Sequence, residues 1–255
     1  MKPLATLVSL FAVSALLVPA SPAAAQTDFD AQGLVDKIVA LQSAIDQKQM
    51  SAGMRGDPIP DKFDVNGYFT VLDQLHLEPG FILDWVYANR GIGGYPVLYA
   101  RTSDAQPFAN FAAYAGFPAN TREPPSVTAA DRERLRYGYL EKIRAADSPA
   151  GFFQLAVLRL LGDRFLLNWH EYYNEIALVC SQPGWQAVLK RERERGEPYA
   201  PPPADFIAAA EKLDFAPVIQ ITDTQVDVDV TTYCPFRGLE RCHFEISRPF
   251  PHRIL

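Results

Sequence analysis

The segment from Trp169 to Glu175, with the sequence Trp-His-Glu-Tyr-Tyr-Asn-Glu, holds the densest group of side chains that could do chemistry. A histidine beside a carboxylate is a common arrangement for a general base. His170, with Glu171 or Glu175 beside it, is therefore the candidate catalytic group of a hydrolase. The segment lacks the paired histidines of zinc proteases, because the residue four after His170 is asparagine. We predict no metal and no cofactor, although one histidine with two glutamates could still hold a metal.

The aromatic residues of the same segment favour binding over catalysis. Trp169, Tyr172 and Tyr173 combine apolar rings with polar edges, which is typical of side chains that line a ligand pocket. They are the candidate ligand-binding residues. Aromatic side chains around a polar loop are also typical of an ordinary hairpin end, so a structural role is the commoner explanation.

Other patterns that could carry chemistry are weak. Gly91 and Gly93 precede a predicted strand rather than a helix, which indicates a hairpin loop and not a phosphate-binding loop. Asp227 and Asp229 alternate along a predicted strand, as acids do on a solvated sheet face. His252 lies in an extended, proline-containing tail where the sequence indicates no partner for it. The G-x-S-x-G and S-x-x-K motifs of serine hydrolases are absent from the sequence.

The first residues of the chain predict export. Lys2 provides a positive start, residues 4–18 form an apolar run, and Ala23-Ala24-Ala25 forms an A-x-A exit before Gln26. No later stretch approaches the roughly 20 apolar residues that cross a bilayer. We expect a cleaved signal peptide over residues 1–25 and a soluble periplasmic or secreted chain, with no membrane insertion after cleavage.

The net charge of the chain argues against nucleic acid as a partner. The formal charge is −6, and an acidic surface repels phosphate backbones and anionic headgroups. In the one dense basic run, over 190–195, cations alternate with glutamates. This pattern is typical of a solvated helix end.

The chain contains three cysteines, so two of them could form a disulfide and one would be left over. Cys234 and Cys242 flank the loop 235–241, and an oxidising compartment favours a bridge between them. We predict a Cys234–Cys242 disulfide, which leaves Cys180 as a buried thiol at the end of an apolar run. A pairing through Cys180 stays open at this point.

Apolar periodicity and turn signals outline the elements that must position these residues. Ser148 and Pro149 mark the start of a helix over 150–161 that is apolar almost all round, as a central buried helix is. Further helices are predicted over 30–49, 65–75, 128–146, 183–195 and 205–213. Strands are predicted over 81–88, 95–101, 164–169, 175–180, 217–222, 225–233 and 241–247.

The order of these elements predicts an α+β fold, in which N-terminal helices and a β-hairpin precede helices packed on a mostly antiparallel sheet. Pro124-Pro125 is the candidate boundary between an N-terminal helix and hairpin lobe (26–125) and a C-terminal α+β lobe (126–255). The alternative is one continuous domain over 26–255.

Weak catalytic motifs and abundant aromatics favour a non-catalytic binding or envelope-associated protein. Its partner would be a small molecule, a peptide or an envelope component. One alternative is a secreted or periplasmic hydrolase that uses His170 with Glu171 or Glu175. The other is a structural subunit or inhibitor that acts through its surface, for which we expect a large exposed apolar patch.

Overall fold

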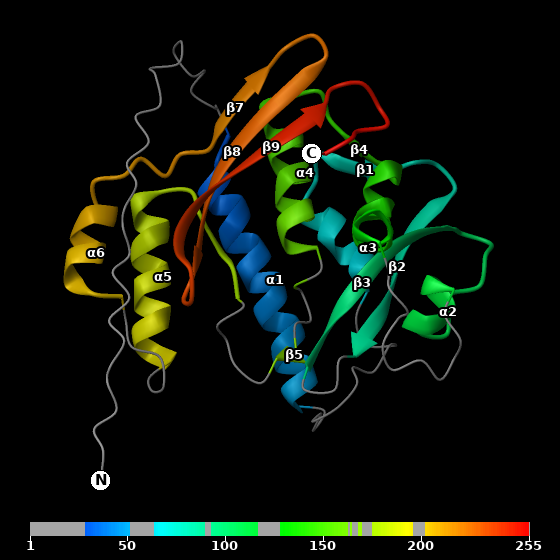
Figure 1. Cartoon of the computed structure of the whole chain (residues 1–255), viewed down its shortest axis with the longest axis horizontal. Helices are drawn as coiled ribbons and strands as arrows, with labels where there is room; N and C mark the ends of the chain where they lie inside the picture. Colours follow the sequence, from blue (N-terminus) through cyan, green and yellow to red (C-terminus); the bar gives the residue numbers. More distant parts are fainter. Residues whose placement is uncertain are drawn as a thin grey trace.

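The α+β fold is confirmed by a computed structural model. The structure describes residues 29–51, 64–89, 93–116, 128–162, 164, 168–169, 175–195 and 202–254. Two helices, α1 (Ala31–Ser51) and α4 (Pro149–Leu161), lie at the centre of the view, between a sheet of long strands and a separate β-hairpin (Figure 1).

Helix α4 is the central buried helix that its sequence predicts. The Ser148 side chain accepts a hydrogen bond from the backbone N–H of Gly151, and Pro149 occupies the first turn, where its missing N–H costs nothing. The backbone N–H of Gly162 closes the last turn on the carbonyl of Leu158. The side chains of this helix are buried on several sides, and those with no measurable exposure are Phe152, Phe153, Leu155 and Ala156.

The main sheet packs one face on α4. Strand β8 (Gln225–Cys234) pairs with β9 (Gly238–Ser247) along its whole length. The other edge of β8 pairs first with β7 (Val218–Ile221) and then with β6 (Ala177–Val179), and every pairing is antiparallel. The apolar residues that alternate along β8 belong to the same buried cluster as α4, namely Val226, Val228 and Val230.

The second face of this sheet is covered at one end by α5 (Gln182–Arg195) and α6 (Ala204–Ala210). Trp185 is fully buried there, and its ring contacts those of Tyr233 and Phe215. At the other end the same face carries Asp227 and Asp229, whose side chains are half-buried. The valines of β8 therefore lie on the core face and the aspartates on the solvated face, because successive side chains of a strand point to opposite faces.

The predicted β-hairpin is confirmed as β2 (Phe81–Asn89) and β3 (Gly93–Thr102). The short strand β5 (Asn168–Trp169) pairs with the start of β3. Helices α2 (Phe111–Ala115) and α3 (Ala129–Tyr137) contact this hairpin.

Two predicted helices are wrong in part. The expected helix over 65–75 is a 3₁₀ helix, η2 (Val65–Thr70), followed by strand β1 (Leu75–Leu77). The expected helix over 128–146 ends at Tyr137 and continues as η3 (Gly138–Lys142) and strand β4 (Ile143–Ala145). Strands β1 and β4 pair with each other, so a distant partner rather than local periodicity decides their backbone conformation.

Buried side chains from both predicted lobes form one cluster. It includes Leu83 and Leu98 of the hairpin together with Val228 and Ile246 of the main sheet. The candidate boundary at Pro124-Pro125 lies outside the described residues. The division into lobes therefore stays a prediction.

The predicted Cys234–Cys242 disulfide is wrong, because none of the three cysteines forms a disulfide in the structure. Cys234 lies opposite Gly238 and Cys242 opposite Val230 in the β8–β9 register. The two cysteines are thus separated along the hairpin by roughly 13 Å, at about 3.3 Å per residue. The Cα atoms of a disulfide lie no more than about 7 Å apart.

The pairing through Cys180 is also excluded in this structure. Cys180 directly follows β6, on one edge of β8, while Cys242 is in β9 on the opposite edge. An intervening strand places their Cα atoms about 10 Å apart, at the usual spacing of roughly 4.8 Å per strand. Burial also raises the pKa of the Cys180 thiol to about 12, which suppresses the reactive thiolate.

We therefore expect three alkylatable thiols per chain after recovery from an oxidising compartment. The measurement is intact mass after denaturation with iodoacetamide and without reductant, and three added labels are expected. Under native conditions Cys180 should react more slowly than the partly exposed Cys242, because its thiol is buried and its thiolate is suppressed. A single added label in the denatured chain would instead show a disulfide and contradict the strand register.

Candidate functional site

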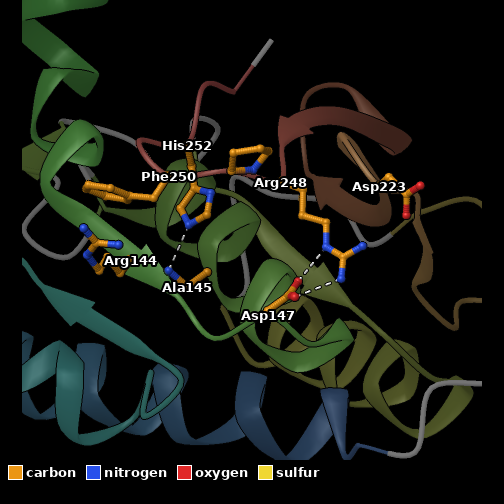
Figure 2. A pocket seen from close by; sticks show the side chains of 8 residues that line it. Arg144, Ala145, Asp147, Asp223, Arg248, Phe250 and His252 are labelled. Carbon is orange, nitrogen blue, oxygen red and sulfur yellow. Dashed lines mark hydrogen bonds and ion pairs between the residues drawn. The ribbon is translucent and has the colours of Figure 1, made fainter.

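A cavity of about 370 Å³ lies where the chain segment after β9 crosses β4 (Figure 2). We call it the tail cavity. Strand β4 and the turn after it provide one wall, the β7–β8 turn provides one end, and the last described residues provide the rest. Its lining residues are Arg144, Ala145, Asp147, Asp223, Arg248, Pro249, Phe250 and His252.

His252 holds the tail against β4. Only 5% of the residue is exposed. Its Nε2 atom accepts a hydrogen bond from the backbone N–H of Ala145 at 3.2 Å, so the ring proton lies on Nδ1, which donates to the carbonyl of Ser247 at 2.9 Å. The ring also lies edge-on to Phe152 of α4. Because both ring nitrogens are engaged with backbone, His252 positions the wall of the cavity and does not serve as a general base.

Arg248 and Asp147 form an ion pair across the middle of the cavity (Figure 2). Two guanidinium nitrogens donate to the two carboxylate oxygens, each at 2.8 Å, and Nη1 donates to the carbonyl of Thr222 at 2.8 Å. The hydrogen bond from Arg248 holds the pKa of Asp147 below its ordinary value. All three nitrogens of Arg248 are therefore used in joining the β7–β8 turn to the turn before α4.

Arg144 is the cation that remains open to a ligand. Its guanidinium carbon lies 3.7 Å from the ring centre of Phe250, so the ring covers one face of the planar group. Nη2 makes one contact with Glu78, at 3.4 Å, and Glu78 is shared with Lys142 at 3.3 Å. The Arg144 side chain is 51% exposed. A stacked guanidinium with free N–H edges is suited to binding a carboxylate through two parallel hydrogen bonds.

The structure does not bring the predicted site residues to this cavity. His170, Glu171, Tyr172 and Tyr173 lie outside the described residues, and Trp169 is described only by its backbone pairing with Gly93. Figure 1 places β5, which ends at that tryptophan, far from β4. Glu175 is half-buried just before β6. Catalysis at His170 and binding at the aromatic residues stay predictions.

Sequence reasoning missed the tail cavity because no local pattern marks it. The atoms joined by its hydrogen bonds belong to residues 101 and 107 positions apart. The one available signal is the run of arginine, proline, phenylalanine and histidine over 248–252, which combines one cation with several rings. Such a run does not show which strand it will cross.

The acidic face of the main sheet offers no second site of comparable definition. His243 lies between Asp229, at 3.1 Å, and Asp227, at 3.9 Å. Within the described part of the chain, no group of three or more His, Cys, Asp or Glu side chains could hold a metal ion. This face has the character of a solvated sheet surface.

Comparison with protein-family models, curated proteins and solved structures finds no match to this chain. Among the helices that the structure describes, none is long and apolar enough to cross a membrane. The residues of the tail cavity are therefore the basis for a functional proposal.

Proposed function

We propose that this chain is an exported, non-catalytic binding protein that holds a small carboxylate-bearing ligand in the tail cavity. The observation that carries the proposal is Arg144, a lining residue of the tail cavity whose guanidinium is half-exposed and stacked on Phe250. A cavity of about 370 Å³ is at the small end of the usual range of ligand pockets, roughly 300 to 1,000 Å³.

The chemistry of the lining favours binding over turnover. Serine, threonine, cysteine and lysine are absent from the residues that line the tail cavity, so it offers none of these nucleophiles. The imidazole of His252 is bonded at both nitrogens, and the carboxylate of Asp147 is held by Arg248. His252 and Asp147 therefore contribute to the shape and the charge of the cavity.

The charges also favour a carboxylate over a phosphate. Asp147 and Asp223 line the same cavity as Arg144. Their carboxylates repel a doubly charged phosphate more strongly than a singly charged carboxylate.

Titration calorimetry with N-acetyl-alanyl-alanine, which carries one carboxylate, tests the proposal. Arg144→Gln should weaken binding at least tenfold, because a charge-assisted hydrogen bond contributes roughly 1.5–3 kcal/mol. The matched control is Arg237→Gln, since the Arg237 side chain is 49% exposed and also makes one ion pair, with Glu240 at 3.3 Å. An affinity that is equal in wild type and Arg144→Gln would remove the tail cavity as the binding site.

Export is tested by the mass of the chain recovered from outside the cytoplasm of a bacterial host. We expect the chain to begin at Gln26, because small residues at positions 23 and 25 permit cleavage there. Ala25→Arg should block that cleavage and leave the longer chain. Recovery of wild type in the cytoplasm with residues 1–25 attached would contradict export.

A further inference from the structure

The last described residues, 249–254, form a tail that is docked on β4 and α4 through one buried side chain. His252 is the buried residue of this tail, and its Nε2 atom accepts a hydrogen bond from the backbone N–H of Ala145 at 3.2 Å (Figure 2). Its Nδ1 atom donates to the carbonyl of Ser247, at the end of β9. Its ring lies edge-on to the fully buried ring of Phe152. Docking of the tail on β4 therefore uses an Nε2 atom that carries no proton.

The other contacts between this tail and the rest of the chain lie nearer to solvent. Arg248, which precedes the tail, is fixed by the ion pair described above. Beyond it, the ring of Phe250 covers the half-exposed guanidinium of Arg144, and Ile254 forms an isolated bridge with Ile246. The tail thus has a fixed start, and its buried contact with β4 is the histidine.

Protonation of His252 is incompatible with this docking. An imidazolium group has an N–H on both nitrogens and accepts no hydrogen bond. A protonated Nε2 would face the backbone N–H of Ala145, so two donors would oppose each other and the N–H would lose its acceptor. In water, histidine gains its proton below about pH 6.5.

The nearest charges do not compensate for the lost hydrogen bond. Asp147, in the turn before α4, is a carboxylate that interacts with His252 through charge, but both of its oxygens accept hydrogen bonds from Arg248. Arg144 of β4 and Arg253 of the tail each add a positive charge beside the ring. The surroundings therefore favour the neutral imidazole.

More distant groups do not change this balance. Helix α4 presents an apolar ring to His252, and Asp223 lies on the far side of Arg248 from it in Figure 2. Glu78 is already paired with two cations of the β4 region. In β1, the residue opposite Arg144 is His76, which is exposed.

We propose that the tail is an acid-released strap, which detaches from β4 when His252 is protonated while Arg248 keeps its start in place. Release uncovers Phe152 and removes the wall of the tail cavity that the tail provides. The released state binds one proton more than the docked state. Each pH unit below about 6.5 therefore favours release by close to a factor of ten. The cavity is complete at neutral pH and opens in acid.

The backbone amide of Ala145 reports docking directly, because its acceptor is His252. Hydrogen exchange of the full chain, followed by NMR, gives the protection factor of this amide. We expect it to fall about thirtyfold from pH 7.5 to pH 5. The amide of Ala146 is the internal control, since it donates instead to the carbonyl of Gln74 at 2.8 Å and should stay protected. Both pH values lie above the pKa of Asp147, which is held below its ordinary value, so the ion pair with Arg248 persists.

Two variants assign the effect to one histidine. His252→Phe keeps a ring against Phe152 but cannot accept a hydrogen bond. Its Ala145 amide should be at least tenfold less protected than in wild type at pH 7.5, with no further fall at pH 5. His76→Gln is the matched control, because it removes the exposed histidine of the neighbouring strand, and it should keep the full wild-type fall.

The proposal is overturned if protection of Ala145 relative to Ala146 is the same at pH 7.5 and pH 5 in wild type. A fall of wild-type size in His252→Phe, or its loss in His76→Gln, also overturns it. If His252→Phe does not fold, the comparison of wild type with His76→Gln decides. The amide measurement uses no ligand, so its outcome is independent of the proposed function.

Discussion

Replacing Gly151 with alanine should lower the free energy of unfolding by about 3 kcal/mol or more, the largest effect we expect of any single methyl group in this chain. Gly151 lies in the first turn of α4, where the chain leaving β4 passes close by. A Cβ atom at this position would overlap the carbonyl oxygen of Ala146 and approach its backbone nitrogen and carbonyl carbon at 2.9 Å.

The backbone of Ala146 cannot easily move aside. Its N–H donates to the carbonyl of Gln74 at 2.8 Å, and its carbonyl accepts from Ser148 at 2.7 Å. Relief of the overlap would therefore break hydrogen bonds that join β1, β4 and α4. Because Asp147 follows directly, we also expect Gly151→Ala to weaken binding in the tail cavity.

Gly67→Ala is the matched control for this prediction. Nothing lies within 4 Å of a Cβ at that position, so alanine should change stability by less than about 1 kcal/mol. Urea denaturation followed by far-ultraviolet circular dichroism measures both variants. Equal midpoints for the two would show that the chain between β4 and α4 has room that the structure does not give it.

Gln154→Leu should lower the free energy of unfolding by about 2 kcal/mol, although leucine is of similar size and more apolar. Gln154 is a buried polar side chain of α4, with 5% of the residue exposed. Its amide donates to Asp73 at 2.9 Å and accepts from the backbone N–H of Gln74 at 2.8 Å. Leucine would leave that N–H without its acceptor and would remove one of two donors to the Asp73 carboxylate, the other being the Gln74 side-chain amide at 3.3 Å.

The same variant should also change how stability depends on pH. The hydrogen bond from Gln154 is the largest cause that holds the pKa of Asp73 below its ordinary value. A carboxyl group whose pKa is lower in the folded state stabilises the protein above its unfolded pKa, about 3.9, and this contribution is lost as pH falls through the folded pKa. Gln154→Leu should therefore lose less stability than wild type between pH 5 and pH 3.

Gln186→Leu provides the surface control, because Gln186 is an exposed helical glutamine on α5. Its effect should stay within about 0.5 kcal/mol at neutral pH, and its acid sensitivity should match that of wild type. If Gln154→Leu were as stable as this control, the polar contacts between α4 and residues 73–74 would be dispensable.

The functional residues were harder to predict from the sequence than the secondary structure was. The segment 169–175 concentrates aromatic and acid–base side chains, so sequence reasoning selected it. The tail cavity instead takes single residues from β4, the β7–β8 turn and the tail. His252 has no partner within its own segment apart from Ser247 and Phe250, and its contact with β4 exists only in the folded chain.

The cysteines also show that sequence separation does not determine which residues come into contact. In an irregular loop, Cys234 and Cys242 could come close enough to form a disulfide. In the observed β8–β9 hairpin, the strand register holds their Cα atoms too far apart for that bond. Which of the two forms depends on the strand register, and the register depends on what the buried face of β8 packs against. Sequence separation alone therefore led to the wrong pairing.

Local signals in the sequence are enough to predict the central helix, the β2–β3 hairpin and the two-faced strand β8. Each of these depends on signals within a few residues: a serine cap with a following proline, a glycine-containing loop between β-prone runs, and alternation of valine with aspartate. Three other features depend on contacts between distant segments of the folded chain. Residues 75–77 and 143–145 are strands, the thiols are kept apart, and Arg144, Asp223 and the tail line one cavity. Hydrogen bonds and ion pairs between distant segments satisfy these backbones and charges, and no local pattern specifies such partners.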